Sequence, residues 1–382
     1  MAHRLLFYPV GNGDTSQIIL ENGRRILFDY HHCGSGKNTS SPIIDLASRL
    51  KKELTDAKQD FFDVVAFTHG DSDHIKGSTE FFELLHAAKY QGSERIKIKE
   101  LWVPAAMILE TAKIDEQSDE FVIWRQEARY RLIKGKGVRV FSKPEQLKKW
   151  LEENGLTVES RKHLITDAGT IAPGFSLALD EVEFFCHSPF IKHVDDADDL
   201  RNSASLIFNI RFTHSSEVYN YFAVGDTKAN ILADIVNISE NHGNSDRLEW
   251  DIFNIPHHCS YLALNEEDKG DSETTPHDDV EKLLLKGNSG AYMICSSNPI
   301  GNNQVDYEQI QPPHIQAKNC YVRYLKRNNG GQFLVTMEEP NKKLPEPIEI
   351  LIGSDGIRLH SIAVSASSIL TGSSIPRAGK NG

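Results

Sequence analysis

Long hydrophobic runs are missing from this sequence of 382 residues. A membrane-spanning helix needs about 18 consecutive apolar residues, and no stretch approaches that length. The opening stretch, MAHRLLFYPVGNGD, has too few apolar residues for a signal peptide, and polar turn residues follow them directly. We therefore expect a cytoplasmic protein that does not work within a membrane.

Cysteine is scarce and scattered along the chain. The five cysteines are odd in number, and no two of them form a Cys-x-x-Cys pair. This distribution argues against a disulfide scaffold and against a structural zinc knuckle. We interpret the thiols as buried and free; they are Cys33, Cys186, Cys259, Cys295 and Cys320.

Basic residues are also fewer than acidic residues in this sequence. The chain has 42 Lys and Arg residues against 54 Asp and Glu residues, which gives a formal net charge of -12. This balance argues against a protein that coats nucleic acid through a generally basic surface. Nucleic-acid binding stays open at a local cleft that contains metal ions.

Strand and helix patterns alternate along the chain. FDVVAFT (62–68) is typical of a strand buried on both faces, and the spacing of leucines in 42–54 predicts a helix. Residues 78–90 and most of 105–165 also predict helix, whereas CYVRYLKR (320–327) is interpreted as a strand. The alternation predicts an α/β sandwich with two sheets inside and helices outside.

The two ends of the chain differ in composition. Residues 1–362 are expected to form one domain, interrupted by a helical insertion at about 105–165. Residues 363–382 consist mainly of small and polar side chains, which predicts a disordered tail.

The segment FTHGDSDHIKG, residues 67–77, places four metal-binding side chains within six positions. They are His69, Asp71, Asp73 and His74, directly after a predicted buried strand. Imidazole and carboxylate groups are the ligands that a pair of divalent cations requires. One such residue alone would favour a simple helix cap, but the four together predict a metal site.

This loop resembles the motif of the metallo-β-lactamase superfamily, His-x-His-x-Asp-His, with Asp71 at the second position. PVGNGDTSQIIL, ILFDY with Asp29, NYFAVGD with Asp226, and NIPHHCS resemble further elements of that family. The last of these is similar to the PHHGS element of a subgroup, the soluble hydrolase domains related to the ComEC DNA-uptake protein. That subgroup often has aspartate at the second ligand position. The similarity covers roughly residues 1–362, and it does not extend to the membrane channel of ComEC.

The resemblance implies a four-layer αββα metallo-β-lactamase sandwich that holds two divalent metal ions. His69 and Asp71 would bind the first metal, Asp73 and His74 would bind the second, and Asp226 would bridge them. A carboxylate at Asp71 makes the first site harder than a histidine would. It therefore favours manganese or magnesium over zinc, although metal availability also decides.

The pair His257 and His258 follows another predicted strand. At least one of the two is expected to bind metal or to protonate the leaving oxygen, and His258 is favoured. The alternative is one buried, hydrogen-bonded histidine beside an exposed one. Asp73 is expected to serve catalysis as well as metal binding. Cys259 stands where the similar PHHGS element has glycine.

Other histidines and one aspartate are candidates with an open alternative. His187 lies about where the superfamily has a further metal ligand, and His314 could be a last ligand or contact phosphate. Both could equally be structural histidines. Asp14 could lie at the floor of the cleft and contact substrate, or only hold its turn. His31 and His32 could reach the rim of the cleft, although surface positions are favoured.

The expected activity is metal-dependent hydrolysis of a phosphodiester, as a nuclease or phosphodiesterase on DNA, RNA or a nucleotide. One alternative is hydrolysis of a thioester, lactone or lactam. Another is an inactive module that binds a partner protein. The insertion at 105–165 could be a lid, a homo-oligomer surface or a docking face. Its basic segment, 124–140, could contact a phosphate backbone, although a solvated helix face is favoured.

Overall fold

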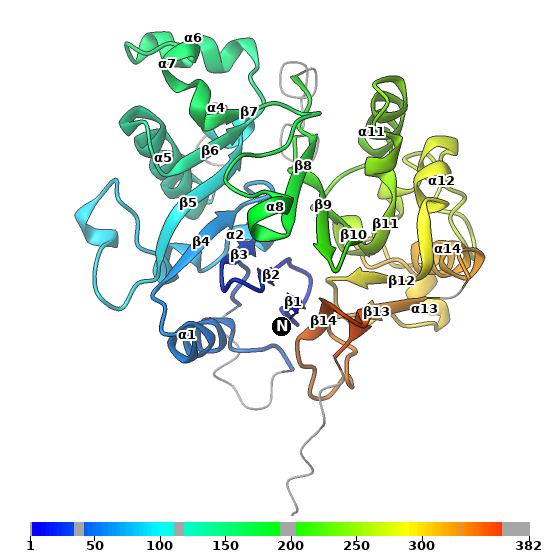
Figure 1. Cartoon of the computed structure of the whole chain (residues 1–382). Helices are drawn as coiled ribbons and strands as arrows, with labels where there is room; N and C mark the ends of the chain where they lie inside the picture. Colours follow the sequence, from blue (N-terminus) through cyan, green and yellow to red (C-terminus); the bar gives the residue numbers. More distant parts are fainter. Residues whose placement is uncertain (1, 34–41, 111–117, 192–203, 330, 361–382) are drawn as a thin grey trace, which may run out of the picture.

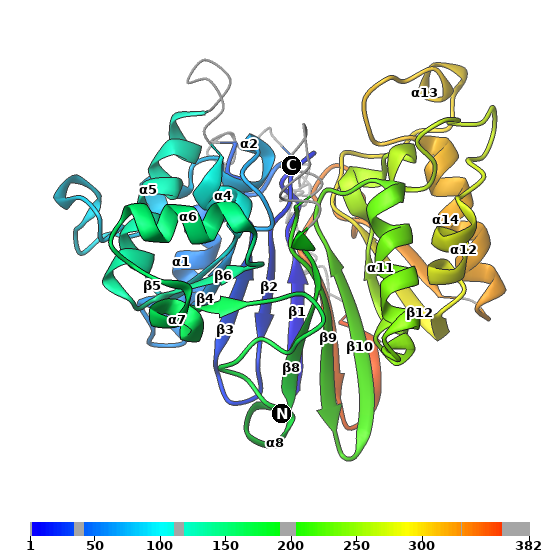
Figure 2. The ribbon, with the colours of Figure 1, turned by 90° about the horizontal axis from the view of Figure 1, so that it is seen from above.

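The computed structural model describes residues 2–33, 42–110, 118–191, 204–329 and 331–360. Their strands form two sheets that pack face to face, with helices on both outer sides (Figures 1 and 2). The predicted four-layer sandwich is therefore confirmed. The predicted tail at 363–382 lies outside the described residues. None of the described helices has the length and apolar character needed to cross a membrane.

The first sheet has nine strands in the order β15-β14-β1-β2-β3-β4-β5-β6-β7. Strands β1 to β3 pair antiparallel, and β3 to β7 run parallel. Parallel neighbours need crossover connections, which place helices on the outer face of this sheet. The bounds are β1 (His3–Phe7), β2 (Ser16–Ile19), β3 (Arg25–Phe28), β4 (Phe61–Ala66), β5 (Lys97–Pro104), β6 (Val138–Phe141), β7 (Ile165–Thr166), β14 (Ile348–Gly353) and β15 (Gly356–Leu359).

The second sheet has six strands in the order β13-β12-β11-β10-β9-β8. Strands β8, β9 and β10 pair antiparallel, whereas β10 to β13 run parallel. The bounds are β8 (Val182–Ser188), β9 (Ile207–His214), β10 (Glu217–Val224), β11 (Trp250–Asn254), β12 (Gly287–Cys295) and β13 (Gln332–Val335).

Two groups of helices cover the sandwich (Figure 2). On the first sheet lie α1 (Leu46–Asp56), α2 (Ser72–Ile75), α3 (Ser78–Phe81), α4 (Ala105–Leu109), α5 (Asp119–Lys134), α6 (Glu145–Glu153) and α7 (Val158–Arg161). On the second lie α11 (Ala229–Asn241), α12 (Asp278–Leu284), α13 (Gln304–Tyr307) and α14 (Ile315–Arg327). The short helices are α8 (Leu177–Asp180), η2 (Ala88–Tyr90), η4 (Lys162–Leu164), η5 (Ser245–Leu248), η6 (Pro256–Cys259) and η7 (Tyr261–Ala263).

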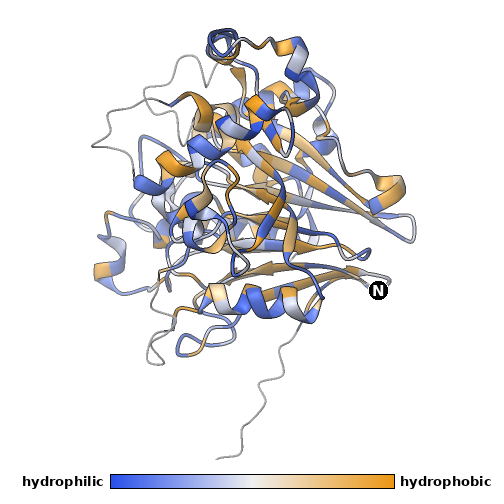
Figure 3. Cartoon of the chain, turned by 90° about the vertical axis from the view of Figure 1, so that its left-hand side faces the viewer, coloured by the Kyte–Doolittle hydropathy of each residue, from blue (hydrophilic) through white to orange (hydrophobic). Residues whose placement is uncertain are grey.

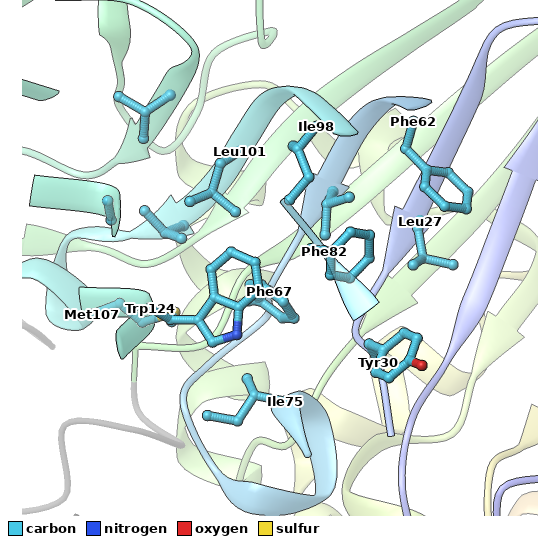
Figure 4. Packing of buried hydrophobic residues seen from close by; sticks show 14 of the residues in the cluster. Leu27, Tyr30, Phe62, Phe67, Ile75, Phe82, Ile98, Leu101, Met107 and Trp124 are labelled. Atoms are coloured by element: carbon cyan, nitrogen blue, oxygen red, sulfur yellow. The ribbon is translucent and has the colours of Figure 1, made fainter. Parts of the chain in front are cut away.

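Apolar side chains fill the space between the sheets and under each helix layer. Figure 3 shows the same pattern along the ribbon, with orange strands inside and mixed blue and orange helices outside. Under the first helix layer, Ile75 of α2 packs in one cluster with Phe67 and Trp124 (Figure 4). The core thereby anchors the short helix that follows the ligand-rich loop.

Two predicted elements were wrong in type or extent. Residues 320–327 lie in α14 and not in a strand, because the buried residues from Ile315 to Leu325 recur at helical spacing. The β-rich composition of CYVRYLKR hid that longer pattern. The helix predicted at 78–90 ends at Phe81, because Phe82 is extended and bridges to Ile96.

The segment 105–165 also contains a strand that was not predicted. Strand β6 pairs in parallel with β5 and widens the first sheet. Helices α4, α5, α6 and α7 lie around it, so the helical content is as predicted. The basic side chains of α5 are partly used inside the protein, since Arg125 and Arg129 donate hydrogen bonds to the carbonyls of Glu110 and Ile108.

Candidate metal centre

The first half of the site is built by the loop between β4 and α2. Strand β4 is buried over most of its length, and the chain after it delivers His69, which is 1% exposed. Helix α2 begins at Ser72, so Asp73 and His74 stand in its first turn. Ligand atoms of His69, Asp73 and His74 all lie within 4.8 Å of one another.

A second group shares His74 and brings together three further segments. Asp14 comes from the β1–β2 connection, Asp226 follows β10, and His258 follows β11. Ligand atoms of these four buried residues also lie within 4.8 Å of one another. The Nε2 atom of His74 is 3.4 Å from Oδ1 of Asp226 and 4.0 Å from Oδ2 of Asp14. Two interlocking groups therefore meet at the ring of His74.

His258 connects the two groups. Its Nε2 atom lies 3.1 Å from Oδ2 of Asp73 and 3.6 Å from Oδ1 of Asp226. Its Nδ1 atom is 2.8 Å from the carbonyl oxygen of Ser296, so Nδ1–H donates to that carbonyl. A histidine held in this way presents Nε2 to the site, as metal-binding histidines commonly do.

His74 is oriented by Asp29, a carboxylate at the end of β3. Its Nδ1 atom lies 2.7 Å from Oδ2 of Asp29. Asp29 also accepts hydrogen bonds from the backbone N–H and the hydroxyl of Thr68, at 2.7 and 2.6 Å. With Nδ1–H donating to this fixed carboxylate, Nε2 of His74 faces the second group.

Several buried atoms at the centre have no hydrogen-bond partner among the described residues. They are Nε2 of His69, Nε2 of His74 and Oδ1 of Asp226. Buried polar atoms are normally hydrogen-bonded, so this concentration of unpaired atoms is typical of a cation-binding site. Imidazole nitrogens and carboxylate oxygens at this spacing suit divalent transition metals. The residues present therefore fit one or two such ions.

The electrostatics of the protein alone agree with a cation site. Burial lowers the pKa of His258, but Asp226 and Asp73 outweigh it and raise the pKa to about 10. Burial likewise opposes the rise in the pKa of His74, which Asp29 and Asp226 bring about. The surrounding carboxylates thus draw protons onto both rings. A metal ion would replace those protons.

Three consecutive residues after β11 have a left-handed backbone. His257, His258 and Cys259 have φ values of 50°, 49° and 67°. Each non-glycine residue in this region costs about 1 kcal/mol or more, and such strain persists mainly at functional sites. The glycine of the similar PHHGS element would remove the strain at Cys259. The turn holds Nε2 of His257 3.6 Å from Oδ2 of Asp226.

Asp71 and His257 lie beside the two groups but outside them. Oδ2 of Asp71 is 3.5 Å from Nε2 of His69, and the side chain is partly exposed. Asp71 occupies the N-cap position of α2 without a side-chain capping bond, so the capping alternative is not realised. Both side chains lie beside buried members of the centre, Asp71 beside His69 and His257 beside Asp226.

Two predicted candidates are not brought to the centre. His187 faces away, with Nε2 3.0 Å from the carbonyl of Arg247 and Nδ1 3.3 Å from the hydroxyl of Ser239. His314 precedes α14, where Nε2 contacts the carbonyl of Ile310 and Nδ1 accepts from the N–H of Tyr261. Both rings form hydrogen bonds that connect separate segments of the chain. This is the structural role that was the alternative to metal binding for each histidine.

Two supporting residues were missed or misplaced. The sequence places Asp29 in the family resemblance but assigns it no role. Its position at the end of a strand could have indicated that it supports a ligand. His31 was expected at the surface, yet it is buried and its Nδ1 lies 2.8 Å from the carbonyl of Asp73. A Cβ atom on Gly13 would collide with the His31 ring, at 2.3 Å. The GNGD turn thus needs glycine to seat His31.

Helix α5 braces the ligand loop from outside. The ring of Phe121 lies where a Cβ atom on Gly70 would be, at 2.2 Å. The carboxylate of Glu120 accepts hydrogen bonds from the backbone N–H groups of Gly77 and Thr79, at 2.8 and 3.2 Å. Part of the expected insertion is therefore support for the site.

Comparison with known proteins gives likeness of fold only. No family model and no curated protein matches the sequence. A diphosphatase of the PhnP family is similar at 11% identity and a TM-score of 0.31, over 82% of this chain and 95% of that one. Unliganded yeast PDE1 is similar at 10% identity and a TM-score of 0.42, over 88% and 97%.

A third similar structure is MEM-A1, a subclass B3 metallo-β-lactamase from a soil metagenome library. It has 12% identity and a TM-score of 0.30, over 66% of this chain and 75% of that one. At TM-scores this low, none of these likenesses carries an argument about activity.

Proposed function

We propose that this protein is a metal-dependent hydrolase that cleaves phosphodiesters. The observation that carries the proposal is the pair of interlocking ligand groups that share His74. The atoms of His69, His74 and Asp226 that have no hydrogen-bond partner belong to these groups, which supports metal binding over a purely structural network.

The proposal gives each side chain a role. His69 and Asp71 would hold one cation, and Asp73, His74 and His258 would hold the other, with Asp226 between them. Asp14 is proposed as an additional ligand, because its carboxylate lies among His74, Asp226 and His258. Its predicted contact with substrate is thereby replaced by a contact with metal. His187 and His314 are left out of the proposed ligand set.

Divalent ions bound here would supply activation of water and neutralisation of negative oxygens. The protein itself supplies rigid positioning, because Asp29 and Ser296 fix the two central rings. His257 is accessible to solvent, with 20% of its side chain exposed. Burial lowers the pKa of His257, so its ring is largely neutral at pH 7. A phosphodiester anion beside it would favour its protonated form and so prepare a proton donor.

The charge of the centre supports a phosphodiester substrate and a hard metal. The centre contains four carboxylates, those of Asp14, Asp71, Asp73 and Asp226, which is more than a histidine-rich metal site has. Oxygen donors of this kind suit manganese and magnesium. Two such ions would neutralise the four carboxylate charges and present cations to which anionic phosphate oxygens could bind. The narrower resemblance to the ComEC hydrolase domain and the choice of nucleic acid or nucleotide stay predictions.

A substrate panel tests the proposal. Protein loaded with manganese is assayed on single-stranded DNA, duplex DNA, RNA, cyclic dinucleotides and bis-p-nitrophenyl phosphate, and in parallel on a thioester, a lactone and a lactam. We expect cleavage of phosphodiesters only. Cleavage confined to carbon-centred substrates would replace the proposal by that activity, and bound metal with no cleavage would favour a partner-binding module.

A matched pair of variants ties any activity to the centre. Asp73→Ala should abolish cleavage, whereas His187→Ala should retain it, because the hydrogen-bond partners of His187 among the described residues, Arg247 and Ser239, lie outside the centre. Asp71→His should shift the metal preference towards zinc, since it replaces an oxygen donor by a nitrogen donor. An unchanged preference would show that Asp71 does not bind metal.

A further inference from the structure

A second set of metal-binding side chains lies at the other end of the sandwich. Asp14 follows β1, whereas His3 begins the same strand, so the two residues stand at opposite strand ends. Ligand atoms of His3, Glu21 and Glu181 all lie within 4.8 Å of one another. Glu21 comes after β2 of the first sheet, and Glu181 lies between α8 and β8 of the second. The group therefore spans the two sheets near α8, at the edge of the sandwich seen at the bottom of Figure 2.

Two separations at this site, one within the group and one between Glu21 and the neighbouring His214, are close to those between metal ligands. Nε2 of His3 lies 3.6 Å from Oε2 of Glu181, and Nδ1 of His214 lies 3.6 Å from Oε2 of Glu21. Both distances are too long for good hydrogen bonds. Around a tetrahedral zinc ion with bonds of about 2.0–2.1 Å, neighbouring ligand atoms are about 3.3–3.4 Å apart.

Two buried nitrogens at this site, one in the group and one in the neighbouring His214, have no hydrogen-bond partner among the described residues. They are Nε2 of His3, whose residue is 0% exposed, and Nδ1 of His214. A neutral imidazole beside carboxylates is the form that binds zinc.

We propose that His3, Glu21 and Glu181, with His214 beside them, bind a zinc ion that ties the first sheet to the second. Mixed nitrogen and oxygen donors suit zinc, whereas calcium and magnesium prefer oxygen alone. The role is structural, because the site lies away from the candidate metal centre and bridges elements far apart in sequence. The proposal does not rest on the hydrolase function.

Zinc binding changes the tautomer of His3. The N–H of Glu21 donates to Nδ1 of His3 at 3.3 Å, so the proton of the neutral ring lies on Nε2. Zinc at Nε2 moves that proton to Nδ1 and breaks the long hydrogen bond from Glu21. The tautomer exchange is visible in the nitrogen chemical shifts of the ring, and it is specific to this residue.

The test uses the complete chain without an affinity tag. Crystals grown with zinc are measured at the zinc absorption edge, and thermal unfolding is followed as zinc is added. We expect anomalous density bonded to His3 and Glu181. We also expect a rise in Tm of about 4 °C when free zinc exceeds Kd about 100-fold.

His3→Gln should lose the anomalous density at this site and the corresponding part of the Tm shift. Glu181→Gln, at a partly exposed position, serves the same purpose if His3→Gln folds poorly. His242→Gln removes an exposed histidine elsewhere and should leave both signals unchanged. The proposal is overturned if zinc density appears only at the candidate metal centre, or if His3→Gln and Glu181→Gln keep the full shift and the wild-type His3 ring keeps its tautomer.

Discussion

The carboxylate of Asp29 holds the ring of His74 in place, with 2.7 Å between Oδ2 and Nδ1. The same carboxylate is fixed by two hydrogen bonds from Thr68, next to His69 in the chain. One buried acid therefore positions the histidine that both ligand groups share. In proteins that bind metal, partners of this kind set the orientation and the basicity of the ligand.

Asp29→Asn should weaken binding of manganese by about 10- to 100-fold while the fold is kept. The side-chain amide cannot accept the hydrogen bonds from both His74 and Thr68 as the carboxylate does. The ring of His74 therefore loses its fixed orientation. Isothermal titration measures the change. Asp251→Asn is the control, because Asp251 is a partly buried acid that also accepts a hydrogen bond from a backbone N–H, that of Asn220, but it lies at the start of β11, away from the centre. Equal effects of the two substitutions would contradict the role of Asp29.

Metal binding should release protons near neutral pH. The pKa of His258 is raised to about 10 and that of His74 is raised well above its ordinary value, so both rings are protonated in the metal-free protein at pH 7. A metal must displace these protons, and its apparent affinity should rise up to about tenfold per pH unit for each proton released. Titrations in buffers of different ionisation enthalpy count the protons. An affinity independent of pH between 6 and 8 would contradict these assignments.

The metal-free protein should lose stability as the pH rises from about 6.5 to about 10. The pKa of His258 is higher in the folded chain, about 10, than the ordinary value of 6.5. Its contribution is therefore fully present below pH 6.5 and is lost as the pH rises through 10. Urea unfolding at several pH values measures this slope. His258→Gln should flatten it, and an unchanged slope in that variant would show that other groups cause the loss.

Gly70→Ala should destabilise the protein by about 1–3 kcal/mol, because the added Cβ meets the ring of Phe121 at 2.2 Å. Phe121→Ala alone should also destabilise, since it opens a cavity between α5 and the ligand loop. The double variant tests the contact directly. Its loss should be smaller than the sum of the two single losses. Additive losses of stability would mean that the ring of Phe121 does not contact Gly70.

Much of the site could be predicted because its ligands are close together in sequence. His69, Asp73 and His74 share one loop after a buried strand, so their meeting needs no knowledge of the fold. Asp226 and His258 were found because each follows an apolar strand in an arrangement that resembles a known family. The layers of the sandwich followed from the alternation of strand and helix patterns.

Other contacts depend on pairings that the sequence does not reveal. Asp14 joins the ligand groups only because β1 and β2 pair next to β3 and place their turn at the same edge as the ligand loop. His187 could not be separated from a ligand by sequence, because its partners Arg247 and Ser239 come from distant segments. The proposed zinc site of His3, Glu21, Glu181 and His214, here called the distal group, has no sequence motif. Its members come from four separate elements.

The central claim is that two metal ions at one centre carry out phosphodiester hydrolysis. The most direct measurement is the rate of bis-p-nitrophenyl phosphate cleavage as manganese is added to metal-free protein, in the His3→Gln chain so that the distal group takes up no metal. We predict that the rate rises until about two equivalents are bound and that His74→Ala abolishes it, since His74 belongs to both ligand groups. No cleavage after two equivalents are bound, or a full rate in the His74→Ala variant, would contradict the claim.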